Sequence, residues 1–186
     1  MYTDFYKFAA FPFQLTPDHR FYFDGRTHRL ALANITNGLR KGEGFIVVTG
    51  EVGTGKTTLI DHLLSQSRDK RLITAKIVTS QVEADNLLRL LAGAFGLAYK
   101  GVDKVTLLDN IEEFLIVSCK AGGQPLLIID EAQSLTHSSL EQLQVLSDFQ
   151  HGATPVLQIL LVGQPQFREA LMSDSLARLR QRIIAS

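Results

Sequence analysis

The 186-residue sequence has one cysteine, no tryptophan, five prolines and a formal net charge of zero. Cys119 has no partner for an internal disulfide, which favours a reducing compartment, and we interpret it as a small buried apolar residue. Basic and acidic residues number 19 each, so no global charge attracts nucleic acid or an anionic membrane. A zero net charge is still compatible with a local basic patch. No apolar run reaches the roughly 20 residues of a membrane-spanning helix, and we expect no signal peptide in the first ten residues.

Short apolar or β-branched runs alternate with helical patterns along most of the chain. The strand-like runs cover residues 45–49, 72–79, 126–129 and 156–162. Strands that alternate with helices form βαβ units, which predicts an α/β fold with a parallel sheet flanked by helices. With 45% hydrophobic residues and this length, we expect residues 1–186 to form a single domain.

Three of the helices have a predicted capping box, in which a hydroxyl residue is followed three positions later by an acidic residue. The pairs are Ser80 with Glu83, Thr106 with Asp109, and Ser138 with Glu141. Each pair predicts that its helix begins directly after the hydroxyl residue.

The N-terminal segment is rich in phenylalanine and tyrosine around Pro12 and Pro17, which prevent one long helix. We expect residues 1–40 to form an aromatic arm and a helix, and residues 41–186 to form the core. Two roles for the arm are open. It docks on the flank of the domain, or part of it forms a wall of an adenine pocket.

A phosphate-binding loop pattern, G-x-x-x-x-G-K-[ST], follows the first predicted strand. Its residues, with the threonine after it, are Gly50, Glu51, Val52, Gly53, Thr54, Gly55, Lys56, Thr57 and Thr58. Such a turn directs backbone N–H groups toward one point, and the helix predicted from Gly55 adds the positive end of its dipole. This arrangement suits the phosphates of a nucleoside triphosphate, with Lys56 on the β- and γ-phosphates and Thr57 as a ligand of Mg²⁺.

Two acidic residues, Asp130 and Glu131, directly follow the apolar strand at 126–129. The carboxyl ends of parallel strands face the ligand crevice, so Asp130 is placed to bind Mg²⁺ beside Thr57. Glu131 points elsewhere and is a candidate to polarise the water that attacks the γ-phosphate. The alternative for both residues is a solvated turn.

Polar residues also follow two other strands. The Gln164 amide is placed to hydrogen-bond the γ-phosphate or the attacking water, and the alternative is an ordinary turn residue before proline. Thr79, Ser80 and Gln81 end the second strand, where a polar side chain is able to hold Glu131 inactive until a partner binds. Helix capping by Ser80 is the commoner explanation for that group.

Three arginines, Arg178, Arg180 and Arg182, lie close together near the end of the chain. In a helix, Arg178 and Arg182 share a face and Arg180 lies nearly opposite. They form a solvated face, or one of them reaches the γ-phosphate of a neighbouring subunit as an arginine finger. The five histidines show no metal-ligand spacing, and His28 is interpreted as a surface or packing residue.

Taken together, these motifs resemble the AAA+ ATPases of the general secretion pathway A type, and within them the ATPases associated with exosortase and exopolysaccharide loci. The similar stretches are residues 11–18, 44–58, 129–133, 143–149, 162–165 and 180–183. The Phe-Pro-Phe stretch near the N-terminus and the Val-Gly-Gln-Pro turn are more specific than the phosphate loop.

The resemblance implies a P-loop NTPase with an ATP-binding AAA+ core, a strand order of 5-1-4-3-2 and activity as a ring or other oligomer. The implied site residues are Lys56 and Thr57 as Walker A, Asp130 and Glu131 as Walker B, Gln164 as first sensor, and Arg182 or, second, Arg180 as finger. Such ATPases continue into a fifth strand and a helical lid. Because the sequence ends near that strand, we expect the strand to be truncated or absent, the lid to be missing and turnover to be weak.

Three functions compete. The leading one is a cytoplasmic ATPase, with a peripheral place at the inner membrane as a further option, that drives a secretion or exopolysaccharide export system. It uses ATP and Mg²⁺, forms a homo-oligomer when the lid is present, and has components of that system as partners. The second is a DNA-binding AAA+ regulator of the transposition type, which the zero net charge disfavours. The third is a scaffold that binds ATP without useful turnover.

Overall fold

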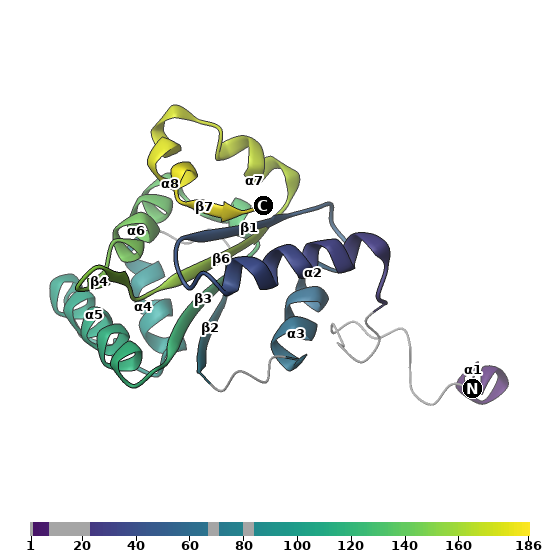
Figure 1. Cartoon of the computed structure of the whole chain (residues 1–186), viewed down its shortest axis with the longest axis horizontal. Coiled ribbons are helices and arrows are strands. Elements are labelled where there is room, and N and C mark those ends of the chain that lie inside the picture. The colour runs from purple at the N-terminus through teal and green to yellow at the C-terminus, as the bar shows by residue number, and fades with distance from the viewer. Residues whose placement is uncertain (1, 8–22, 67–70, 80–83) are drawn as a thin grey trace.

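The structure, a computed structural model, describes residues 2–7, 23–66, 71–79 and 84–186. A sheet of five parallel strands runs through its centre, in the order β2 (Leu72–Val78), β3 (Gln124–Asp130), β6 (Gln158–Gly163), β1 (Phe45–Thr49) and β7 (Ile183–Ala185) (Figure 1). When β7 is counted as the fifth strand of the core, this is the predicted order 5-1-4-3-2. The alternative that the fifth strand is absent is wrong, because Ile183 and Ala185 pair with Phe45 and Ile46.

Helices cover both faces of this sheet (Figure 1). One face is covered by α2 (Arg26–Leu39) and α3 (Lys56–Gln66). The other is covered by α4 (Ala84–Ala94), α5 (Lys104–Lys120), α6 (His137–Ser147), α7 (Pro165–Ala170) and α8 (Ala177–Gln181). The remaining short elements are α1 (Tyr2–Tyr6), the 3₁₀ turns η2 (Ala132–Ser134) and η3 (Asp174–Leu176), and a hairpin of β4 (Gln150–His151) and β5 (Thr154–Pro155).

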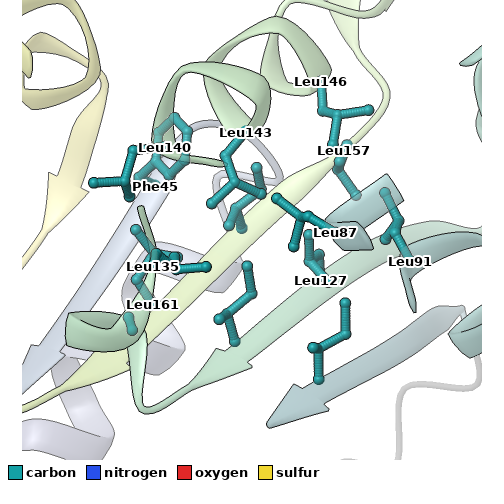
Figure 2. Close-up of a cluster of buried hydrophobic side chains, with 14 of the residues drawn as sticks. Phe45, Leu87, Leu91, Leu127, Leu135, Leu140, Leu143, Leu146, Leu157 and Leu161 are labelled. Carbon is teal, nitrogen blue, oxygen red and sulfur yellow. The ribbon is translucent and has the colours of Figure 1, made fainter. Parts of the chain in front are cut away.

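Alternate residues of β3 face opposite layers, as expected for a strand buried on both sides. Leu126 and Ile128 contact the cluster under α2 and α3, whereas Leu127 and Ile129 belong to the larger cluster on the other face. Figure 2 shows part of that larger cluster, in which leucines of α4 and α6 meet β1, β3 and β6. Burial of these side chains, each contributing about 1.5–3 kcal/mol, holds the strand ends in fixed positions.

The strands end at one edge of the sheet because every pair is parallel. Val78 is opposite Asp130, and Thr49 is opposite Gly163. The predicted strand 156–162 begins two residues later, at Gln158, because the hairpin precedes it. None of the helices in the described part of the chain is both long and apolar enough to cross a membrane.

Most of the aromatic arm, residues 8–22, lies outside the described residues, and its two predicted roles stay predictions. The described aromatic side chains of Phe5, Tyr6 and Phe23 are exposed. The end of α2, which follows the arm, is tied to the sheet because Gln158 Nε2 donates to the Gly38 carbonyl oxygen at 2.9 Å.

Two of the predicted capping boxes are wrong, and the third, Ser80 with Glu83, lies outside the described residues. The N-cap of α5 is Asp103, whose carboxylate accepts from the N–H groups of Val105 and Thr106 at 3.0 Å each. The N-cap of α6 is Thr136 rather than Ser138. In both cases a better-placed acceptor lies two or three residues upstream of the predicted one, so the helix begins earlier.

Hydrogen bonds from the hydroxyl and the N–H of Thr106 lower the pKa of Asp103 below its ordinary value of 3.8. A lowered folded-state pKa adds stability that is present above the unfolded value and is lost as the pH falls through the folded value. We therefore expect Asp103→Asn to lower the thermal unfolding midpoint at pH 7. The deficit should shrink as the pH falls below 3.8.

Thermal melts from pH 7 to pH 3 measure this difference, with Asp109→Asn, an exposed site later in the same helix, as the matched control. The control should show little change at any pH. A deficit for Asp103→Asn that stays constant across the range would contradict the assignment of the cap charge.

Candidate nucleotide site

The phosphate-binding loop joins β1 to α3 at the edge where the strands end. Its turn requires two residues with positive φ, Gly53 at 79° and Gly55 at 78°, a conformation that costs little only for glycine. The stretch from Glu51 to Thr54 is exposed, and the residues from Gly55 to Thr58 are partly buried as the helix begins. The helix begins at Lys56, which agrees with the predicted start near Gly55.

The Lys56 ammonium group lies within the loop. Its Nζ donates to the carbonyl oxygens of Gly50 at 2.8 Å and Glu51 at 2.9 Å. The Glu51 carbonyl oxygen also accepts from the Thr54 hydroxyl at 2.8 Å, so this oxygen links both ends of the turn. The loop therefore holds a positive charge beside the N-terminus of α3, which favours an anionic ligand.

Thr57 and Asp130 come together although they lie 73 positions apart. The Thr57 hydroxyl donates to Asp130 Oδ2 at 2.7 Å, and Asp130 is only 4% exposed. A hydroxyl and a carboxylate are hard oxygen donors of the kind that Mg²⁺ prefers. No group of three or more His, Cys, Asp or Glu side chains within the described ranges is arranged to hold a metal. The pair therefore fits an ion that takes its other ligands from phosphate and water.

Glu131 has a left-handed backbone, with φ of 57°. For a residue other than glycine this conformation costs about 1–3 kcal/mol, and surrounding contacts must maintain it. The Thr79 hydroxyl lies 2.9 Å from the carbonyl oxygen of Asp130 and 2.8 Å from that of Glu131, and donates to them. Thr79 thus contacts the main chain of Glu131, not its carboxylate, while Ser80 and Gln81 lie outside the described residues.

The Glu131 carboxylate instead meets two glutamine side chains. Gln133 Nε2 donates to Glu131 Oε2, and Gln164 Nε2 donates to the same oxygen at 3.4 Å. Gln133 also accepts, at its Oε1, from the Gln164 N–H at 3.0 Å. The structure therefore brings Gln164 to Glu131 as the strand order implies, and adds Gln133, for which the sequence had suggested no role.

Of the two predicted roles for His28, surface or packing residue of the first helix, the structure supports packing: the residue is partly buried in α2. Its Nε2 lies 2.9 Å from the carbonyl oxygen of Thr54, in the middle of the phosphate-binding loop. A carbonyl oxygen only accepts, so Nε2 carries the proton in this contact. No local pattern predicts it, because the two residues are 26 positions apart.

The three C-terminal arginines have different surroundings. Arg178 is exposed, whereas Arg180 donates from Nη1 to the Leu171 carbonyl oxygen at 3.2 Å. Arg182 donates from Nη1 to the Ser147 hydroxyl at 2.6 Å and forms an ion pair with Asp148. A solvated face describes Arg178 only, because Arg180 and Arg182 have partners within the chain.

Comparison with known proteins identifies the class to which this loop and sheet belong. A family model described as an AAA domain matches residues 39–171, and the chain therefore belongs to the AAA domain family. General secretion pathway protein A of Aeromonas hydrophila is 37% identical over all 186 residues, which make up 34% of that protein. The chain thus spans about a third of this relative, and the resemblance to ATPases of the general secretion pathway A type is confirmed.

Two solved structures support the same fold. Cdc6p of Pyrobaculum aerophilum superposes with a TM-score of 0.69 at 16% identity, covering 93% of this chain and 47% of that one. The ADP form of ORC2 from Aeropyrum pernix gives a TM-score of 0.63 at 18% identity, covering 86% of this chain and 46% of that one. At such identities the likeness concerns the fold alone.

The His28 contact predicts a measurable effect on nucleotide affinity. His28→Ala removes the hydrogen bond that fixes the middle of the loop, so ATP should bind about 3- to 10-fold more weakly. Titration with a fluorescent ATP analogue measures Kd, and a melting curve checks that the variant folds. His151→Ala, exposed on the β4–β5 hairpin, is the matched control and should bind as the unaltered chain does. Equal affinity in all three would contradict the proposed support of the loop.

Proposed function

We propose that the protein binds ATP with Mg²⁺ and hydrolyses it at the edge formed by β1, β3 and β6. The observation that supports this most directly is the 2.7 Å contact between Thr57 Oγ1 and Asp130 Oδ2, next to the phosphate-binding loop. Membership of the AAA domain family supports nucleotide binding independently. In this proposal residues 50–58 bind the phosphates, and Lys56 transfers its hydrogen bonds from the loop carbonyls to phosphate oxygens.

Glu131 acts as the general base in this proposal. Its carboxylate takes a proton from the attacking water, whose oxygen forms the new bond to the γ-phosphorus while ADP leaves with the electrons of the broken bond. The Gln164 amide, which already lies against Glu131 Oε2, orients that water or the γ-phosphate. Thr57 and Asp130 would hold Mg²⁺, which when bound neutralises charge that develops on the phosphate oxygens.

Replacement of the base tests the assignment. Glu131→Gln keeps the size of the side chain and needs the same left-handed backbone, but it removes the proton acceptor. We therefore expect kcat to fall at least about 100-fold while ATP still binds. Phosphate release and nucleotide titration measure the two effects, with Glu169→Gln, exposed on α7, as the control. Unchanged turnover in Glu131→Gln would remove Glu131 from this role. If the unaltered protein binds ATP without hydrolysing it, the ATPase proposal fails and the scaffold that binds ATP without useful turnover is the function that remains.

We infer that ATP turnover operates a secretion system, because the curated relative is a general secretion pathway protein. Its components are the proposed partners, and the place of action is the cytoplasm or the cytoplasmic surface of the inner membrane. Exopolysaccharide export is the narrower form of this proposal and depends on the resemblance to exosortase-associated ATPases. The DNA-binding alternative is not advanced, because the net charge is zero and the two similar solved structures support only the fold.

Arg182 stays our first choice for a finger that acts on a neighbouring subunit. The Arg182 side chain is 30% exposed and that of its partner Asp148 is 63% exposed, so the pair lies near the surface. A finger role requires Arg182 to exchange both Asp148 and the Ser147 hydroxyl for the γ-phosphate of the next protomer. Exposed ion pairs contribute at most about 1 kcal/mol, so the contact with Asp148 adds little to the cost of that exchange.

Subunit mixing tests this role. Arg182→Ala and Glu131→Gln should each be inactive alone, whereas a mixture should regain turnover, since one subunit supplies the arginine and the other the base. Asp148→Asn is the matched control, because it breaks the same ion pair but keeps the arginine, and it should stay active. Failure of the mixture to recover activity, with both variants folded, would exclude Arg182 as a finger acting between subunits.

A further inference from the structure

The Gln133 side chain joins two parts of the site that are distant in sequence. It lies in η2, two residues after Glu131, and is partly buried. Its NH₂ group faces the Glu131 carboxylate and its oxygen faces the Gln164 N–H. A carboxylate only accepts and a backbone N–H only donates, so these two partners together determine which way the amide points.

The end of β6 leaves room for this bridge. A Cβ atom on Gly163 would lie 3.2 Å from Gln133 Oε1 and 3.2 Å from the Cβ of Phe167. Any larger residue at position 163 would therefore press on the amide that reaches the carboxylate. The turn from β6 into α7 and the carboxylate of Glu131 are thus connected through one side chain, not through the sheet alone.

We propose that Gln133 is a positioning residue that holds the Glu131 carboxylate beside Gln164, where the carboxylate takes the proton of the water that attacks the bound nucleotide. This inference rests on the proposed ATPase function. The side-chain amides of Gln133 and Gln164 both donate to Glu131 Oε2. These two hydrogen bonds together favour one orientation of the carboxylate, with Oε2 between the two amides. Without Gln133, the longer 3.4 Å contact to Gln164 is left to orient a side chain that has several rotamers of its own.

Two substitutions distinguish positioning from mere packing. Gln133→Met keeps the length of the side chain but removes both polar contacts, and Gln133→Glu keeps the shape and an acceptor for the Gln164 N–H. If Gln133 only fills polar space, the glutamate variant should be the better tolerated. If Gln133 positions Glu131, the glutamate variant should be the worse one, because it places a second carboxylate against the first.

The experiment measures kcat, KM and nucleotide Kd of the purified protein by phosphate release and titration, with melting curves as a check on folding. We expect kcat to fall about 10-fold in Gln133→Met and further in Gln133→Glu, with KM and Kd within about 2-fold of the unaltered protein. The same two substitutions at Gln166, exposed on α7, are the matched controls and should change nothing.

The outcomes separate this inference from the function on which it rests. Full kcat in both Gln133 variants, or a glutamate variant more active than the methionine variant, would overturn the positioning role and leave the ATPase proposal intact. If nucleotide Kd rises by the same factor as kcat/KM falls, the positioning role is also overturned, since Gln133 would then support nucleotide binding. No turnover in the unaltered protein would remove both.

Discussion

The parallel pairing of β3, β6 and β1 determines where the phosphate-binding loop, the two acidic residues and Gln164 lie. Because the strands run in the same direction, the phosphate-binding loop after Thr49, the acids after Ile129 and Gln164 after Gly163 all emerge at one edge. Leucine and isoleucine side chains on both faces of β3 are fully buried, and no strand can shift by one residue without turning those side chains to the wrong layer. The register of the core thereby sets the 2.7 Å contact of Thr57 with Asp130.

Within that frame the Glu131 region combines strain with support. Glu131 has a left-handed backbone, and its carboxylate contacts two glutamines whereas that of Asp130 contacts Thr57. Thr79, which directly follows β2, binds the two carbonyl groups of this turn, and Gln133 and Gln164 bind the carboxylate. Side chains from two segments thus contact the carboxylate and a third segment supports the backbone beneath it, which is the type of support that the proposed general base requires.

The sequence was sufficient for the parts of the molecule that depend on local pattern. Apolar periodicity predicts the strands and the helix after the loop, and the loop motif with two acids after a strand predicts which residues meet. It failed where several local solutions compete, as at α5, where Asp103 rather than Thr106 caps the helix. It also missed His28 and Gln133, because their contacts depend on how α2 and η2 pack against distant segments, and a lone histidine or glutamine has no pattern that reveals this.

The central claim is that Thr57 and Asp130 form the metal side of a nucleotide site whose other side is the phosphate-binding loop. A crystal structure of the protein with a non-hydrolysable ATP analogue and Mn²⁺, used in place of Mg²⁺ for its anomalous signal, tests it most directly. The account predicts triphosphate along residues 50–57, Lys56 on its phosphate oxygens, and an anomalous peak beside Thr57 Oγ1 and the Asp130 carboxylate. Nucleotide bound elsewhere, or a metal peak remote from Thr57 and Asp130, would contradict it.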